Sequence, residues 1–239
     1  YKITVSYDGA GFCGWQSQPN GESVQDAIET AVEKLFGARP NVVGSGRTDA
    51  GVHALAQVAH FDSDKTMPLK NVVGGLNAYL PDAVRVMNAE YVESDFDARK
   101  SVKRKTYMYV MYKGACTPLL EPRALRVDEL DVAAMNRAAQ ELVGKHDFAT
   151  FKAAGSGAKT STRTVFDAHV EEKSGLYLFF ITADGFLYNM VRIITAQLVK
   201  VGMGENVDMK ALIEKRDRTA AKETAPAKGL YLYRVDYNS

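Results

Sequence analysis

The 239-residue sequence predicts an α+β fold, in which a mainly antiparallel sheet carries helices on one face. Three observations lead to this class. Segments with the alternation of strands and segments with helical spacing occur in both halves of the chain. Ser174 and Gly175 join two strand-like segments in the manner of a hairpin turn. Apolar residues make up 46% of the chain, which is enough for a sizeable core.

The first half begins with a strand over residues 1–7, and a glycine-rich loop follows at 11–21. Ser23 is expected to cap a helix that ends at Gly37 and Pro40. Its apolar face comprises Val24, Ala27, Ile28, Ala31 and Leu35. A short strand precedes residue 44, and residues 54–62 form another strand. Pro68 opens a helix over residues 69–79, and strands follow at 83–92 and 101–113.

The second half repeats this plan loosely. A helix over residues 131–143 directs Met135, Ala138, Ala139 and Leu142 inward. Residues 164–172 and 176–184 form the hairpin strands, and an apolar helix spans 187–201. A shorter helix at 208–216 and a final strand at 229–237 complete the chain. No linker rich in Pro, Gly or Ser divides the halves, and we place the boundary between residues 1–100 and 101–239.

Composition excludes some classes of protein. Lys and Arg total 30 and Asp and Glu total 29, so net charge alone indicates no partner. Cys13 and Cys116 lack metal-ligand or disulfide spacing, and we expect buried free thiols in a reducing cytosol. No apolar run is long enough to span a membrane, and no signal peptide is visible. The sequence begins at Tyr1 rather than Met, so we expect a short N-terminal piece to precede it.

The stretch GSGRTDAGVHA, residues 44–54, surrounds Arg47, Thr48 and Asp49 with glycines. Glycines permit unusual backbone conformations or the close approach of a ligand. No Lys-Ser or Lys-Thr follows, so this is not a phosphate-binding P-loop. One interpretation is a turn capped by its own Asp49, with Arg47 as an ordinary surface charge. The other is a tight loop that presents a functional carboxylate.

The strand at 101–113 is basic. Six cations and no acid lie between Ala98 and Lys113. Alternation puts Lys103, Lys105, Tyr107 and Tyr109 on one face. Cations beside aromatic rings suit phosphates and unstacked bases. A solvated edge strand protected by lysines explains the same pattern.

Arg192 lies near the start of the apolar helix, whose core-facing residues are Met190, Val191, Ile194, Leu198 and Val201. Its side chain either reaches solvent or pairs with a carboxylate, and such a pair would lower the pKa of the carboxyl. Asp49 and His53 are four residues apart, but no third ligand with suitable spacing accompanies them. A Ser-His-Asp triad lacks its nucleophile elbow.

Together these segments resemble one family, the tRNA pseudouridine synthases of the TruA type. The matching stretches occur in family order and cover nearly the whole chain; they include YDGAGFCGWQ, SVQDAIETAV, GSGRTDAGVHALAQVAHF, DFDARKSVKRKTYMY, GKHDFATF and GFLYNMVRIITAQLVKVG. The resemblance implies the pseudouridine synthase fold, in which two similar α/β-sandwich halves join their sheets around a central cleft. Residues 1–100 would carry the catalytic Asp loop, and residues 101–239 would carry the active-site Tyr and Arg.

The resemblance also implies site residues. Asp49 matches the essential aspartate, Tyr107 the tyrosine that packs on the target base, and Arg192 the arginine that pairs with the aspartate. Arg47 matches an arginine implicated in base flipping, and Thr48, Lys103, Lys105 and Tyr109 are expected to bind substrate. The family isomerises uridines 38, 39 and 40 in the anticodon stem-loop of tRNA. It acts as a homodimer, without cofactor, metal or membrane, and we expect a cytoplasmic location.

Three alternatives remain at this stage. A pseudouridine synthase acting on another RNA would share every catalytic residue. A non-catalytic RNA-binding protein would use the same basic strand, although Asp49 would then repel phosphates. A metal hydrolase would use Asp49 and His53 and would be sensitive to chelators.

Overall fold

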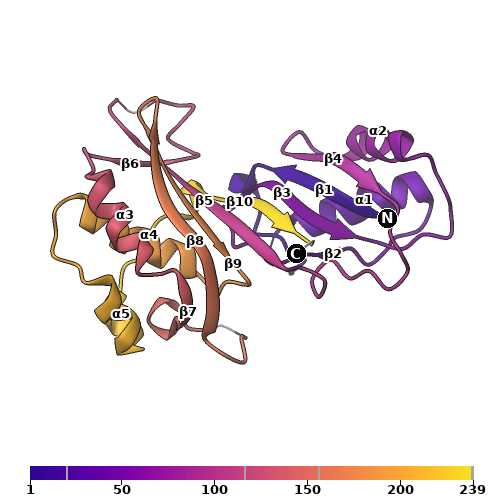
Figure 1. The fold of residues 1–239 in the computed structure, drawn as a ribbon. Coiled ribbons are helices and arrows are strands. Elements are labelled where there is room, and N and C mark those ends of the chain that lie inside the picture. Colours follow the sequence, from indigo (N-terminus) through magenta and orange to yellow (C-terminus); the bar gives the residue numbers. More distant parts are fainter. Residues whose placement is uncertain (20, 116, 156, 238–239) are drawn as a thin grey trace. The chain divides into compact units, whose positions relative to one another are not determined.

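The computed structural model describes residues 1–19, 21–115, 117–155 and 157–237 and contains two compact units. One unit comprises Tyr1–Lys103 together with the chain from Leu232 onward, and the other comprises Arg104–Tyr231. Each unit combines a sheet with helices (Figure 1). The α+β class predicted from the sequence is confirmed. The proposed division at residue 100 into an Asp-bearing and a Tyr/Arg-bearing domain stays a prediction.

The first unit has a sheet in the order β4, β1, β3. These strands are Val84–Glu90, Lys2–Tyr7 and His53–His60, and both pairings are antiparallel. The short β2 (Val43–Gly44) pairs with β3. β10 (Leu230–Asp236), whose residues from Leu232 onward belong to this unit, follows β3 in the strand order. In β1, Ile3, Val5 and Tyr7 are buried, as the alternation predicts.

Two helices accompany this sheet. α1 (Val24–Phe36) is capped by the Ser23 side chain, which accepts from the N–H of Asp26. It ends at Gly37, which has a φ of 84°. α2 (Leu69–Tyr79) packs against α1 and β4. Both helices agree with the sequence prediction. A short 3₁₀ turn, η1 (Gly9–Gly11), follows β1.

The second unit has a sheet in the order β5, β9, β8, β7. The strands are Arg104–Lys113, Leu176–Ala183, Thr162–Lys173 and Gly144–Asp147, and all three pairings are antiparallel. β6 (Leu125–Val127) pairs with β5 in parallel. Ser174 and Gly175 join β8 and β9 with φ values of 52° and 79°. The predicted hairpin and the mainly antiparallel sheet are confirmed; β6 and β7 were not predicted.

Helices α3 (Val132–Gln140), α4 (Met190–Gly202) and α5 (Met209–Lys215) lie on the same side of this sheet in Figure 1. Three 3₁₀ turns complete the unit: η2 (Ala149–Phe151), η3 (Arg218–Ala221) and η4 (Ala227–Gly229). α3 is shorter than predicted, because Leu142 and Val143 donate to carbonyls three residues back. α4 begins at Met190 because Asn189 has a φ of 59°. It is buried on most sides, and Val201 of the expected stripe is only half-buried.

Two further findings concern the composition-based expectations. Cys13 is a free thiol, but it is half-buried rather than buried, and its Sγ donates to the carbonyl of Glu22 at 3.0 Å. Cys116 lies outside the described residues. In the part of the chain that the structure describes, every helix is too short or too polar to cross a membrane.

Candidate active site

Asp49 lies in the loop between β2 and β3, in the first unit. Its carbonyl accepts from the N–H of Val52 at 3.1 Å, which closes a four-residue turn. Gly51, the third residue of this turn, has a φ of 76°, whereas Ala50 does not have a positive φ. This is the geometry of a type II turn, which favours glycine at that position. The turn leaves Asp49 half-buried and its neighbours Arg47 and Ala50 exposed.

Thr48 holds this loop from within the unit. It is 6% exposed, and its hydroxyl lies 2.7 Å from the hydroxyl of Tyr7. Its carbonyl accepts from the N–H of Trp15 at 3.1 Å. Burial raises the pKa of Tyr7 well above its usual value, so its phenol stays protonated. These two hydrogen bonds thus fix the position of Thr48, the residue directly before Asp49.

The start of the loop is held by a buried glutamine. Gln57 accepts from the Ser45 hydroxyl at 2.6 Å and donates to the carbonyl of Gly46 at 3.0 Å. The N–H of Ser45 donates to the carbonyl of Val58 at 2.7 Å. Gln57 was not identified from the sequence, where it stands as a polar residue within the strand expected at 54–62. The structure shows that it is buried in β3. The loop backbone is therefore anchored on both sides of Arg47.

Packing and turn geometry explain Gly44 and Gly51 in this loop, and also Gly14, which lies against it. A Cβ on Gly44 would lie 2.5 Å from the Trp15 indole, so this glycine makes room for the ring. Gly14, with a φ of 107°, would place a Cβ 2.5 Å from the carbonyl of Thr48. Together with Gly51 in its turn, these positions show that close packing and turn geometry require the glycines. The sequence allowed either this reason or the close approach of a ligand, and the approach of a ligand stays a prediction.

His53, the first residue of β3, contacts the turn that follows β1. It is buried, and its Nδ1 accepts from the N–H of Gly9 at 3.0 Å and lies 3.1 Å from a carboxylate oxygen of Asp8. Among the described residues, no group of three or more His, Cys, Asp or Glu side chains is arranged to hold a metal ion.

Tyr107 lies in the middle of β5, in the second unit, and pairs with Ile181 of β9. It is 9% exposed. The edge of one ring meets the face of the other between Tyr107 and Phe186, with centroids 5.0 Å apart and planes at 85°. Phe186 lies just before α4 and was not singled out from the sequence. It sets the orientation of the Tyr107 ring.

Tyr109 has a different environment from the one expected. It is 0% exposed, and its hydroxyl donates to the carbonyl of Pro226 at 2.8 Å. Gly229 approaches its ring so closely that an added Cβ would lie 2.6 Å away. Lys105, two residues earlier on β5, is half-buried, and Lys103, in the first unit, is exposed. The surroundings of Tyr109 are those of a core residue.

Arg192 is tied down at the start of α4. Its Nε donates to the carbonyl of Ala225 at 2.7 Å, and its Nη1 donates to the Asn189 side chain at 2.8 Å. Ala225 in turn donates its N–H to the carbonyl of Arg192 at 3.0 Å. The guanidinium is therefore oriented by the fold of the second unit. Asn189, in its left-handed conformation, supplies the acceptor for Nη1.

The sequence pattern of the tRNA pseudouridine synthase family matches residues 3–99 and 138–238. Tyr107 lies outside the matched segments, whereas whole-length relatives include its region. A tRNA pseudouridine synthase A of Acetivibrio thermocellus is 43% identical over 99% of this chain and 98% of its own length. The protein of that name from Afipia carboxidovorans is 45% identical over 99% of each chain. The chain therefore belongs to the tRNA pseudouridine synthase family, whose members are isomerases.

A solved Cbf5–Nop10–Gar1 complex is a more distant match. Its TM-score is 0.39 at 13% identity, and the alignment covers 85% of this chain and 45% of that chain.

Proposed function

We propose that this protein converts uridine to pseudouridine at positions 38, 39 and 40 in the anticodon stem-loop of tRNA. The observation that carries the proposal is the Asp49 carboxylate on a hydrogen-bonded loop, in a chain that belongs to this family over its whole length. In the reaction the N1–C1′ bond breaks and a C5–C1′ bond forms. The C5 proton is lost and N1 gains one, so the reaction needs no net addition of atoms or electrons.

Asp49 is the reactive group in this proposal. The target base must leave its stack, at a cost of a few kcal/mol. The carboxylate then attacks C1′ or removes the 2′ proton, and both routes use the same residue. A carboxylate on a fixed loop suits either route, because the group is already oriented when the nucleotide arrives. Arg47, exposed beside it, is proposed to hold the flipped nucleotide or fill the vacated space.

Two residues of the second unit serve the same reaction. Tyr107 packs on the extruded uracil and assists the transfer of the C5 proton, and Phe186 keeps its ring in one orientation. Arg192 is proposed to pair with Asp49 and keep it ionised. Hydrogen bonds from Nε and Nη1 orient the guanidinium, and a planar, oriented guanidinium suits the recognition of a carboxylate.

The remaining predicted site residues divide into two groups. Lys103 and Lys105 are proposed to contact phosphates. Thr48 and Tyr109 are buried and hydrogen-bonded within their own units, so we propose that they support the site rather than touch the RNA. We further propose a cytoplasmic homodimer that acts without cofactor or metal.

Tritium release tests this function. tRNA that lacks the modification and carries tritium at uridine C5 is incubated with the wild type, Asp49→Asn and Asp64→Asn, with chelator present. Asp64 is an exposed aspartate of the same unit and serves as the matched control. We expect release by the wild type and Asp64→Asn only. Asp49→Asn should bind tRNA within about tenfold of the wild type, because the change keeps the shape of the side chain.

The other outcomes identify the alternatives. Release from other positions, mapped on the product, would indicate a synthase for a different RNA site. Binding without release by the wild type would indicate a non-catalytic RNA-binding protein. Loss of release on chelation would indicate a metal-dependent reaction. A large loss of binding in Asp49→Asn would make the role of Asp49 structural.

A further inference from the structure

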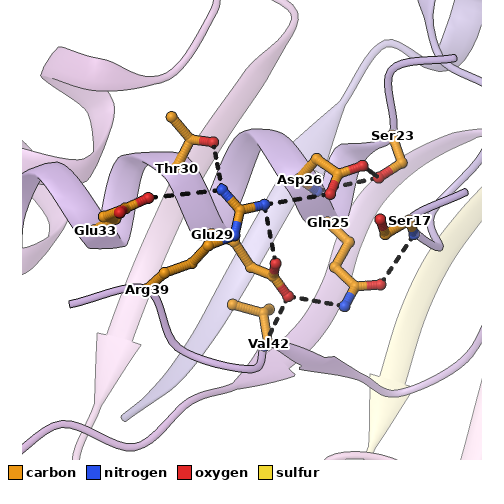
Figure 2. Close-up of polar contacts among 9 residues, drawn as sticks. All are labelled: Ser17, Ser23, Gln25, Asp26, Glu29, Thr30, Glu33, Arg39 and Val42. Atoms are coloured by element: carbon orange, nitrogen blue, oxygen red, sulfur yellow. Dashed lines mark hydrogen bonds and ion pairs between the residues drawn. The ribbon is translucent and has the colours of Figure 1, made fainter. Parts of the chain in front are cut away.

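One arginine, Arg39, contacts several polar side chains along one face of α1 (Figure 2). Arg39 lies 3.3 Å from Asp26, 3.2 Å from Glu29 and 3.7 Å from Glu33, and it donates to the Thr30 hydroxyl at 3.2 Å. These residues follow helical spacing, so they share a face. Arg39 therefore holds the chain that leaves α1 back against the helix. This chain continues into β2 and the Asp49 loop.

Glu29 is the buried member of this cluster. It is 8% exposed, and its Oε2 faces Arg39. Its Oε1 accepts from the backbone N–H of Val42 at 3.2 Å and from the Gln25 side chain at 2.9 Å. Val42 is 2% exposed and comes directly before β2, so without Glu29 its N–H would lose this acceptor in a buried position. Glu29 thus holds the start of the segment that leads to Asp49.

Gln25 extends the connection to the other end of that segment. Its Oε1 accepts from the N–H of Ser17 at 3.1 Å, and its backbone N–H donates to the carbonyl of Trp15 at 3.0 Å. Trp15 donates its own N–H to the carbonyl of Thr48, next to Asp49. Figure 2 shows Gln25 between Ser17 and Glu29. One helix therefore holds the segment from Val42 to Thr48 at both ends.

We propose that Glu29 and Gln25 are positioning residues for the Asp49 carboxylate, with Arg39 orienting Glu29. The inference rests on the proposed function, in which Asp49 reacts with the uridine. The network reaches the Asp49 loop through the backbone at Val42 and Thr48. A displacement of about 1 Å in a reacting group can reduce a rate about 100-fold. Loss of Glu29 should therefore reduce the rate of the chemical step.

The test compares Glu29→Ala, Glu29→Gln, Gln25→Ala and Glu33→Ala. Single-turnover tritium release is measured at saturating tRNA, well below the melting temperature of each variant. We expect Glu29→Ala to slow release by about tenfold or more with little change in tRNA affinity. Glu29→Gln should recover most of the rate, because its amide oxygen can still accept from Val42. Gln25→Ala should show a smaller loss. Glu33→Ala, which removes an exposed Arg39 contact from the same helix, should match the wild type.

Amide hydrogen exchange provides a readout that does not depend on catalysis. Glu29→Ala should speed exchange at Val42, and Gln25→Ala should speed it at Ser17. If the wild type bound tRNA but released no tritium, the proposed function would be overturned. The exchange changes in the variants would then still show that the network fixes the loop. Wild-type rates and exchange in folded Glu29→Ala would overturn the positioning proposal. An equal loss in Glu29→Gln and Glu29→Ala would also overturn it, since the hydrogen bond to Val42 would not then be the cause.

Discussion

Two tyrosines on β5, two residues apart, show how neighbours decide the role of a side chain. Alternation puts Tyr107 and Tyr109 on one face of the strand. The Tyr109 hydroxyl donates a hydrogen bond to the carbonyl of Pro226, and Gly229 packs against the Tyr109 ring. Burial raises the pKa of Tyr109 far above its usual value, so its phenol remains a hydrogen-bond donor. Tyr107 is instead oriented by the ring of Phe186. Tyr109 therefore contributes to stability, and Tyr107 is the tyrosine that we propose contacts a base.

Substitution by phenylalanine should separate these roles. Tyr107→Phe keeps the ring contact with Phe186 but removes the hydroxyl proposed to assist proton transfer. We expect tritium release at saturating tRNA to slow by about 100-fold, the lower end for general acid–base catalysis, with tRNA affinity nearly unchanged. Tyr109→Phe should instead lower the free energy of unfolding by about 1 kcal/mol, since it removes the bond to Pro226. Equal turnover in Tyr107→Phe and the wild type would remove the proton-transfer role.

At the scale of helices and strands, local signals located most elements but not all of their ends. Ser23 and Gly37 mark the ends of α1 because capping depends on residues next to the helix. The start of α4 was placed three residues too early, because the left-handed conformation of Asn189 has no clear sequence signal. β6 and β7 are too short to show alternation, and they form because a neighbouring strand supplies hydrogen bonds.

α2 contains two adjacent glycines that should respond differently to alanine. A Cβ on Gly74 meets nothing within 4 Å, and the residue is exposed inside the helix. Gly74→Ala should therefore raise the free energy of unfolding by about 0.5–1 kcal/mol through helix propensity. Gly75→Ala should raise the free energy of unfolding by less, because its Cβ would lie 2.6 Å from the end of the Leu35 side chain. Urea denaturation of both variants measures this, and a destabilised Gly74→Ala would contradict the prediction.

For the molecule as a whole, net charge and charge distribution have different consequences. The chain carries a net charge of +1, so affinity for RNA must come from local groups of cations. The segment from Arg99 to Lys105 supplies such a group, with Lys103 exposed and Lys105 half-buried. Each phosphate contact contributes to the dependence of binding on salt, because counterions are released when it forms.

Removing two of these charges should flatten the salt dependence of tRNA binding. We expect Lys103→Gln combined with Lys105→Gln to reduce the slope of log K against log salt by about 0.7–0.9 for each lost contact. Lys173→Gln combined with Lys210→Gln, which changes two exposed lysines of the second unit, is the matched control. Filter binding at several salt concentrations gives the slopes. Equal slopes in both double variants would place the phosphates elsewhere on the protein.

The sequence by itself determined the α+β class, the order of the main elements, the α1 caps and the segment that carries Asp49. These features depend on periodicity, on neighbouring residues or on a motif, all of which are local. Only the tertiary structure decided that Tyr109 and the Thr48 hydroxyl are buried, that Gly44 accommodates Trp15, and that Glu29 holds Val42. Each of these depends on which distant residue packs beside the side chain. Alternation along a strand says which way a side chain points, but not whether another segment covers it.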